Sequence, residues 1–205
     1  MPIDLPVSIK TVRMSDGQGK TIVYPRVKGL ANQTLEHLIN RVIVSATRQL
    51  IHQQIQDSPS TLIEMIASYE IKNNQRRVLS LSLSNYAYHY HAAHGMTYLR
   101  ALTFDLEQGK LCQLNDLFKP GSDYSAALLS LIREQIKQRN IQLLNDLPPK
   151  LNEQAFYIAD KTIVLYFQLY EITPYVFGFP MFPISVYDVW DIIDENGPLG
   201  RMAAQ

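Results

Sequence analysis

Alternation of apolar and polar residues predicts that most of the chain is β-strand. Segments with a period of two residues, rich in Val, Ile, Leu, Thr and Tyr, are bounded by Gly, Pro and Asn residues that are typical of turns. The predicted strands are residues 3–14, 21–27, 63–72, 78–91, 96–106, 155–159, 162–171 and 182–193. Because short turns separate most consecutive strands, we expect antiparallel hairpins.

Two segments instead carry apolar residues at spacings of three and four, which form one face of an α-helix. The first begins at Asn32 and ends before Pro59, and the second runs from about Asp123 to Arg139. The apolar face of the first is Leu35, Leu38, Ile39, Val42, Ile43, Ala46 and Leu50. We therefore expect an α+β fold, with two long amphipathic helices packed on one side of an antiparallel sheet.

Three local features refine this prediction. Pro25 marks the strand over 21–27 as an edge strand, because proline cannot donate to a ladder. The Asn-Asn-Gln sequence at 73–75 is a predicted hairpin turn. In the strand 78–91, leucines at 79, 81 and 83 share one face, whereas tyrosines at 86, 88 and 90 share the other. A β-bulge would explain this switch, and so would a strand buried on both faces at different depths.

The length of 205 residues suits one large domain or two small interlocked ones. We expect a hairpin-helix-strand segment over residues 1–75 and an α+β domain over residues 76–195, packed as one unit. The C-terminal residues 196–205 begin with Asn-Gly-Pro, and we expect this tail to fray.

Composition and charge exclude several classes of protein. Apolar residues make up 46% of the chain and charged residues 19%, which excludes a disordered protein. The 19 Lys and Arg balance 19 Asp and Glu, so no global basic field favours nucleic acid or an anionic membrane. No apolar run is long enough for membrane insertion. Without a signal-peptide pattern, the chain as written is predicted to be cytoplasmic, or extracytoplasmic if it is the trimmed part of a longer protein.

Candidate catalytic chemistry is sparse. The chain has no Gly-x-Ser-x-Gly elbow and no phosphate loop. The single cysteine, Cys112, can form neither an internal disulfide nor a cysteine-based zinc site, and we expect it to be a buried apolar residue. His89, His91 and His94 could converge on a zinc ion from a strand end and its turn, as in a metal-dependent hydrolase. Since no carboxylate partner is near in sequence, we expect no metal, no cofactor and no enzymatic activity.

Tyrosine is the more informative residue type, with 12 Tyr against 7 Phe and 1 Trp. Rigid rings with polar tips suit a surface that recognises a protein or a sugar, although tyrosine also fills ordinary sheets. The segment 170–180 is too apolar for a plain surface loop. Either it packs against the core or it contacts a partner.

Residues 88–118 carry an ordered set of motifs that resembles the RsiV/PdaC-type domain family. A Tyr-rich strand is followed by a turn that ends in Ala93-His94-Gly95. The hairpin and the turn after it match the family at Phe104-Asp105-Leu106, Gly109-Lys110, Leu114 and Asp116-Leu117-Phe118. The segment Tyr170-Glu171-Ile172-x-Pro174-Tyr175 is similar to the family's closing loop. This chain departs from the family where His91-Ala92 replaces a Gly-Gly pair.

The resemblance implies an α+β fold and an extracytoplasmic setting in bacteria. Members include the outer part of anti-sigma factors that sense lysozyme and a segment beside a peptidoglycan deacetylase domain. We therefore expect a non-enzymatic binding or sensing module for a lysozyme-like protein or a peptidoglycan-type glycan, with a structural protein without a small ligand as an alternative. The expected binding residues are Tyr88, His94, Gly95, Tyr170, Glu171, Pro174 and Tyr175. For His94 and Gly95 the alternative is a purely structural role in the turn.

Overall fold

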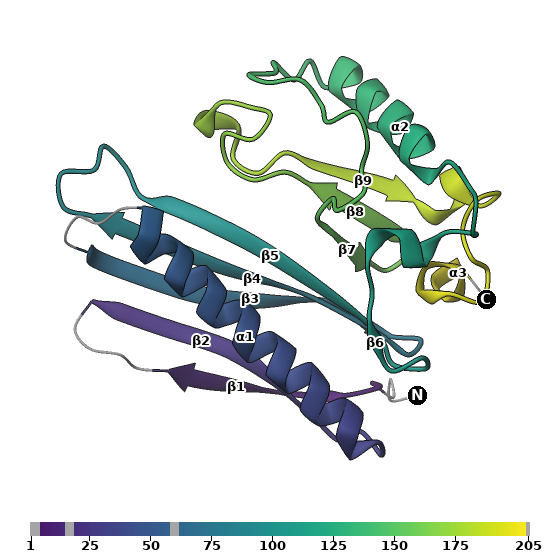
Figure 1. Ribbon diagram of the computed structural model, residues 1–205, viewed down its shortest axis with the longest axis horizontal. Helices are drawn as coiled ribbons and strands as arrows, with labels where there is room; N and C mark the ends of the chain where they lie inside the picture. Colours follow the sequence, from purple (N-terminus) through teal and green to yellow (C-terminus); the bar gives the residue numbers. More distant parts are fainter. Residues whose placement is uncertain (1–4, 15–18, 58–61, 204–205) are drawn as a thin grey trace.

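The computed structural model describes residues 5–14, 19–57 and 62–203, which form an α+β fold of two β-sheets and flanking helices (Figure 1). One sheet has six strands in the order β1-β2-β3-β4-β5-β6, and the other has three in the order β7-β8-β9. The strands of the larger sheet are β1 Ser8–Met14, β2 Lys20–Lys28, β3 Leu62–Gln75, β4 Val78–His89, β5 Met96–Asp105 and β6 Lys110–Leu111. Those of the smaller sheet are β7 Phe156–Ala159, β8 Thr162–Tyr166 and β9 Met181–Ser185.

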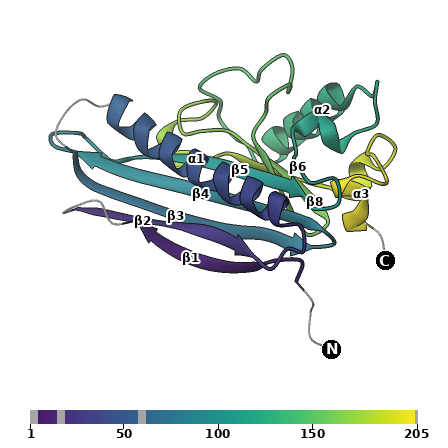
Figure 2. The ribbon, with the colours of Figure 1, turned by 60° about the horizontal axis from the view of Figure 1, so that its bottom comes forward.

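The helices in the described residues differ greatly in length. The α-helices are α1 Gln33–Asp57, α2 Tyr124–Gln138 and α3 Pro198–Ala203. The 3₁₀ helices are η1 Leu114–Leu117, η2 Tyr175–Phe177 and η3 Val186–Val189. The two predicted helices form as α1 and α2, but each covers a different sheet instead of sharing one side of a single sheet. The leucine face of β4 packs with α1, whereas α2 packs with β7, β8 and β9 (Figure 2).

The larger sheet is mixed, which corrects the expectation of purely antiparallel pairing. β2 pairs in parallel with β3, residues Lys20–Ile22 against Met65–Ala67. The sequence between them contains α1, and a helical crossover is the usual connection between parallel strands. The pairing of β1 with β2 is antiparallel, so the predicted N-terminal hairpin is confirmed, although residues 16–18 of its turn lie outside the described residues.

Beyond Ile22, a side chain of α1 takes the place of a strand beside β2. The Asn40 amide accepts from the Val27 N–H at 2.8 Å and donates to the Val27 carbonyl at 2.9 Å. Pro25 also lies in the part of β2 that has no β3 partner. Because it is two residues before Val27, its backbone nitrogen points toward the same edge of β2 as the Val27 N–H, the edge away from β1. β2 is therefore an interior strand, contrary to the prediction, but its proline sits where no ladder hydrogen bond is needed.

β4 is buried on both faces, which explains the change of pattern along it. Its pairing with β5 runs without a shift from Val78–Asp105 to Ala87–Met96, so β4 has no bulge there. The irregularities lie instead in β3. Leu79, Leu81 and Leu83 face α1, and the alternate serines face β7, where the Ile158 N–H donates to the Ser80 hydroxyl at 3.0 Å.

The turn between β3 and β4 is formed by Arg76 and Arg77, both with positive φ (50° and 58°), and not by residues 73–75 as predicted. Asn73 and Asn74 extend β3 and are buried. The Asn73 amide donates to the Val78 carbonyl at 2.7 Å, and the Asn74 amide donates to that of Val7 at 2.8 Å. These asparagines therefore bridge strands. The expected domain division after residue 75 falls at this turn, between two strands of one sheet.

The described part of the C-terminal segment, residues 196–203, packs against the core, contrary to the expected frayed tail. Leu199 and Met202 of α3 are buried in the core below the smaller sheet. Arg201 forms an ion pair with the fully buried Asp105 at 2.8 Å, and its Nε donates to the Arg76 carbonyl at 3.3 Å. We call this junction of α3 with the β3–β4 and β5–β6 turns the closed end of the molecule.

Cys112 is buried in the same core, as predicted. Burial raises the pKa of its thiol to about 12, with a further contribution from the nearby Asp105 carboxylate. The thiol is therefore protonated at neutral pH, and it lacks the thiolate character that a nucleophile needs.

Candidate functional site

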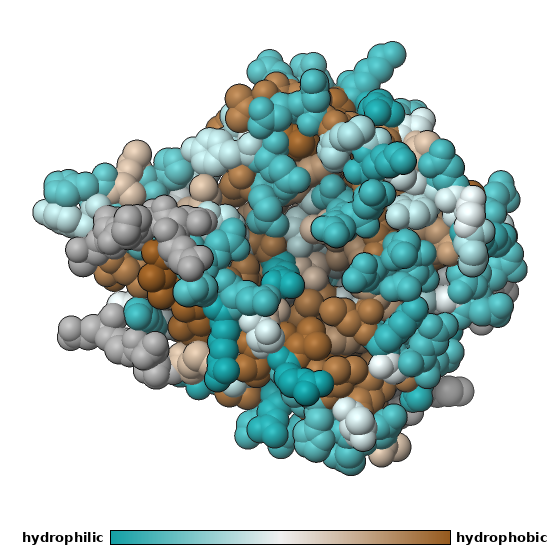
Figure 3. Space-filling view, in the orientation of Figure 1, coloured by the Kyte–Doolittle hydropathy of each residue, from teal (hydrophilic) through white to brown (hydrophobic). Residues whose placement is uncertain are grey.

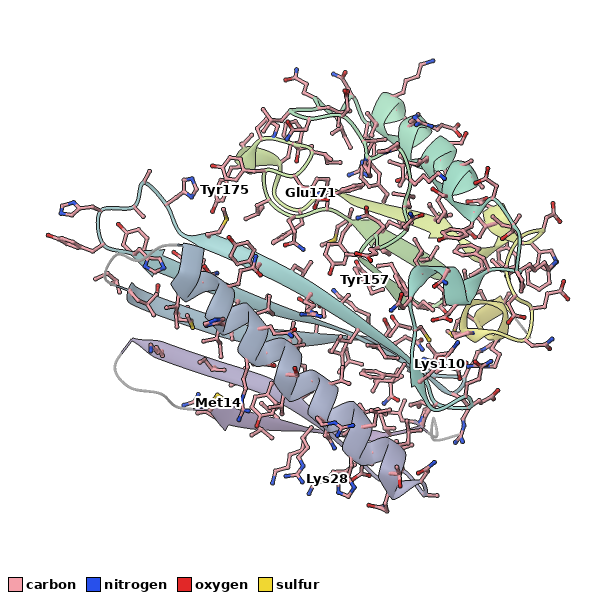
Figure 4. All side chains as sticks on the ribbon, in the orientation of Figure 1. Met14, Lys28, Lys110, Tyr157, Glu171 and Tyr175 are labelled. Atoms are coloured by element: carbon pink, nitrogen blue, oxygen red, sulfur yellow. The ribbon has the colours of Figure 1, made fainter. Side chains whose placement is uncertain are left out.

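Two loops meet at the end of the molecule opposite the closed end. One is the turn between β4 and β5, residues 90–95, and the other is the segment 167–180, which contains η2. Figure 4 shows Tyr175 beside the β4–β5 turn, and Figure 1 places both loops at the same end of the two sheets. We call this region, together with the adjoining loop 141–147, the aromatic end.

His94, Tyr170 and Tyr175 form a cluster at the aromatic end. The His94 ring stacks on Tyr175 with centroids 4.1 Å apart, and its Nε2 lies 3.0 Å from the Tyr170 hydroxyl. Its Nδ1 lies 2.9 Å from the Gly95 carbonyl, which also accepts from the Tyr175 hydroxyl at 3.0 Å. Since a carbonyl can only accept, Nδ1 carries the proton, and in the neutral ring Nε2 accepts from Tyr170.

Gly95 is required by the close approach of Tyr86. A Cβ built on Gly95, which is buried, would overlap the Tyr86 ring. Any residue larger than glycine at position 95 would therefore force the Tyr86 ring to move. Tyr86 was not among the predicted site residues, although its alternation with Tyr88 on β4 was the available signal.

The second loop is held by hydrogen bonds to its backbone, most of them from side chains. Tyr170 has a positive φ of 66°, and the Glu171 carboxylate accepts from the Gln168 N–H at 2.6 Å. The Asn145 amide donates to the Tyr170 and Glu171 carbonyls at 3.3 and 3.0 Å, and the Leu144 N–H donates to the Ile172 carbonyl at 2.9 Å. The aromatic cluster therefore rests on a braced loop.

The segment 170–180 is partly packed against the core, as one of the two predicted alternatives has it, and partly exposed to solvent. Ile172 and Thr173 are fully buried and anchor the loop, whereas Val176 of η2 is 86% exposed. The other exposed large apolar side chains of the aromatic end are Tyr90, Leu143, Leu144, Tyr170 and Phe177. A monomeric surface seldom gathers so many apolar side chains in one region without a use for them.

The predicted site residues separate into three groups. His94, Gly95, Tyr170 and Tyr175 come together in the cluster. Glu171 and Pro174 shape the loop that carries it, the latter as the residue that precedes η2. Tyr88 pairs with Glu64 on β3, and in the described part of the chain it makes no hydrogen bond or ring contact with the cluster. Sequence reasoning missed the loop 141–147, which has no motif and is hydrogen-bonded to the site through Leu144 and Asn145.

The three histidines do not share a site. His89 is buried at the end of β4, His91 is exposed with its ring against Tyr90 at 4.0 Å, and His94 belongs to the cluster. Among the residues that the structure describes, no group of three His, Cys, Asp or Glu could hold a metal ion. His91 also has a positive φ of 62°. The family has Gly-Gly where this chain has His91-Ala92, and glycine adopts this backbone conformation more readily.

A polar cleft of about 590 Å³ lies between the two sheets. The amide side chains along it are Gln49, Gln53, Gln113, Asn152, Gln154 and Gln168. Gln168 accepts from the Leu99 N–H at 3.1 Å and donates to its carbonyl at 2.7 Å, and the Tyr166 hydroxyl accepts from Ala101 N–H at 2.8 Å. Burial raises the pKa of Tyr166, so it stays a phenol while it covers the edge of β5.

Two family models match separate parts of the chain. The model described as Deacetylase PdaC matches residues 19–97, and that described as Protein of unknown function (DUF3298) matches residues 115–187. The chain is 23% identical over 192 residues to peptidoglycan-N-acetylmuramic acid deacetylase PdaC from Bacillus subtilis, covering 87% of this chain and 40% of the relative. It is 28% identical over 175 residues to the anti-sigma-V factor RsiV from the same organism, covering 78% and 60%. The chain thus spans less than two thirds of either relative.

Solved structures show the same fold at low sequence identity. A DUF3298 family member from Bacteroides fragilis aligns with a TM-score of 0.72 and 15% identity, covering 98% of this chain and 99% of that one. A DUF3298 protein from Pseudomonas aeruginosa aligns with a TM-score of 0.60 and 16% identity, covering 96% of both. In the described part of the chain, no helix has the length and apolar character needed to cross a membrane. The two family models, matched in order along the chain, and the two curated relatives together support an RsiV/PdaC-type domain.

Proposed function

We propose that this protein is a non-enzymatic binding or sensing module and that it contacts its partner through the aromatic end. The observation that carries the proposal is that exposed apolar side chains lie on a loop whose backbone is anchored by buried residues and hydrogen bonds. Val176 projects into solvent from a loop whose neighbours Ile172 and Thr173 are buried. An apolar tip on a fixed base loses little conformational entropy when a partner covers it.

The hydrogen bonds of the cluster support the same role. His94 and Gly95 come from the β4–β5 turn, whereas Tyr170 and Tyr175 come from the other loop, and their mutual bonds fix the two loops against each other. Tyrosine rings that are already ordered offer a large contact area together with polar tips, which is typical of residues that dominate binding energy.

The partner that we propose is a lysozyme-like protein, and a peptidoglycan-type glycan is the second candidate. The resemblance to lysozyme-sensing anti-sigma factors supports the first, and the similarity to a peptidoglycan deacetylase supports the second. The partly exposed ring of Tyr170, ordered beside His94, also offers a face on which a sugar ring can stack. Either partner would place this module outside the cytoplasm.

The test compares retention of the protein on immobilised lysozyme and on insoluble peptidoglycan. We expect Val176→Asp to reduce binding by about tenfold or more, because it puts a charge into an apolar contact. The matched control is Tyr187→Ala, which removes an equally conspicuous exposed side chain of η3, outside the aromatic end. If the wild-type protein binds neither ligand, the proposal fails and a structural role becomes the better interpretation.

The metal-dependent hydrolase has less support, because His89, His91 and His94 do not converge. Its test is elemental analysis of the purified protein together with His91→Ala. A stoichiometric transition metal that His91→Ala removes would revive it.

A further inference from the structure

The balanced net charge conceals an uneven distribution along the chain. Residues 1–57 contain seven Lys or Arg and four Asp or Glu, whereas residues 58–205 contain twelve and fifteen. The N-terminal hairpin and α1 therefore carry a net positive charge, which the rest of the chain balances. A local field of this kind acts on a partner within about a Debye length, roughly 10 Å at 0.1 M salt, whatever the total charge.

Three of these seven basic residues line a groove of about 620 Å³ along the outward face of α1. Its lining includes three arginines and two histidines and no carboxylate: Arg26, Arg41, Arg48, His37 and His52. We call it the arginine groove. Figure 3, in the orientation of Figure 1, shows hydrophilic side chains interspersed with hydrophobic ones over the region of α1.

The arginines of the groove are not used by the fold. Among the described residues, no carboxylate forms an ion pair with Arg26, Arg41 or Arg48. By contrast, Arg201 is committed to Asp105, and Arg139 donates to the Met181 carbonyl at 2.8 Å. The acid nearest the start of α1, Glu36, accepts from the Leu30 N–H and lies outside the groove lining. The guanidinium groups of the groove are therefore available to an external anion.

The spacing of these groups favours a chain of anions over a single ion. Arg41 and Arg48 are two turns apart on one face of α1, about 10 Å along the axis. His37 and His52 extend the same face to about 22 Å. One phosphate cannot contact groups spread over about 22 Å, whereas a linear polymer can place successive phosphates along this whole stretch. Guanidinium forks bind phosphate oxygens in pairs, which favours phosphate as the repeating group.

A membrane surface fits this groove less well. Helices that bind anionic bilayers insert an apolar face between the lipids. The apolar face of α1 is already buried against β4 and β5, where Leu35, Ile39 and Ile43 are almost fully covered. Single-stranded nucleic acid fits poorly too, since successive bases stack on several large aromatic rings and Tyr24 is the sole Phe, Tyr or Trp among the lining residues of the groove.

We propose that the arginine groove is a second binding site, for a linear phosphate polymer without bases, that is distinct from the aromatic end. The probe is long-chain inorganic polyphosphate, titrated into the full chain by calorimetry at several salt concentrations. We expect Arg41→Gln with Arg48→Gln to raise the dissociation constant by about tenfold or more. The slope of log K against log salt should fall by about one for each phosphate that the variant no longer binds.

The matched control is Arg133→Gln with Lys137→Gln, which removes two exposed cations from α2 and should leave binding unchanged. Arg26→Gln tests the groove from β2, so a folding defect of the α1 variant would not hide the answer. Equal loss in both double variants would show a nonspecific charge effect and overturn the proposal. So would equal affinity for polyglutamate, binding only to phosphatidylglycerol vesicles, or tighter binding to single-stranded DNA. Retained lysozyme or peptidoglycan binding in the groove variant would separate this site from the aromatic end.

Discussion

The two ends of the molecule are held together by opposite kinds of interaction. At the closed end, Arg201 reaches the fully buried Asp105, and α3 covers the junction with apolar side chains. At the aromatic end, the loops meet through aromatic rings and hydroxyls, and Val176 and Phe177 remain exposed to solvent. A buried charge pair is costly to break, whereas exposed neutral hydrogen bonds are worth little net free energy. We therefore expect substitutions at the closed end to change mainly stability, and substitutions at the aromatic end to change mainly binding.

The largest expected effect is at the closed end. Arg201→Met would leave the buried Asp105 carboxylate without its cation and should lower the free energy of unfolding by about 3 kcal/mol. Urea unfolding followed by circular dichroism measures this difference. The control is Lys119→Met, which breaks an exposed pair with Glu195 and should cost at most about 1 kcal/mol. Equal losses of unfolding free energy in the two variants would contradict the distinction between the buried Arg201–Asp105 pair and the exposed Lys119–Glu195 pair.

Gly95→Ala should be the most damaging small change at the aromatic end. The added methyl group would overlap the Tyr86 ring, and such overpacking costs about 1–3 kcal/mol. The double variant Gly95→Ala with Tyr86→Ala removes the obstructing ring, so a double-mutant cycle should show a favourable coupling. Additive losses would mean that the turn, and not the ring, requires glycine. Binding to lysozyme or peptidoglycan should fall with Gly95→Ala if the turn positions His94.

Asp116 gives the closed end a pH dependence. Partial burial raises its pKa, but the hydrogen bonds from Lys110 and from the Gln113 N–H outweigh burial, and the pKa lies below its ordinary value. Since the folded pKa is lowered, this carboxylate stabilises the fold at neutral pH, and the contribution is lost as pH falls below about 4. Asp116→Asn should cost about 1 kcal/mol at pH 7 and much less at low pH. A constant difference across the pH range would contradict this assignment.

Tyr175→Phe should have the smallest effect on stability. It removes one hydroxyl that donates to the Gly95 carbonyl but keeps the ring stacked on His94, so a loss of about 0.5 kcal/mol is expected from thermal unfolding. Tyr187→Phe, which removes a hydroxyl bonded to Lys161, is the matched control. A much larger loss in Tyr175→Phe would show that the aromatic end contributes to stability as the closed end does.

Local patterns predicted the hairpins and the helical faces well, because strand alternation and turn residues act over a few positions. They failed where a distant segment decided the outcome. The parallel pairing of β2 with β3 depends on how α1 packs on the sheet, because α1 connects the two strands. The burial of Asn73 depends on its hydrogen bond to the Val78 carbonyl of β4. Order in the tail depends on Asp105, far away in the sequence.

The candidate site shows the same limit. The family resemblance grouped His94, Gly95, Tyr170 and Tyr175 as binding residues, and the structure places them together. Tyr86 and Asn145 were missed, because one supports the turn by contact and the other supports the second loop through backbone carbonyls. Such roles leave no local pattern in a single sequence.

The short parallel ladder between β2 and β3 also has a kinetic consequence. Three residue pairs join the N-terminal hairpin to the rest of the sheet, and the two strands lie far apart in the sequence, so this pairing forms late and opens easily. β4, by contrast, is paired along nearly its full length on both sides. Amide protons of β1 should therefore exchange with solvent well before those of β4, through a partial opening that leaves both ends of the molecule intact.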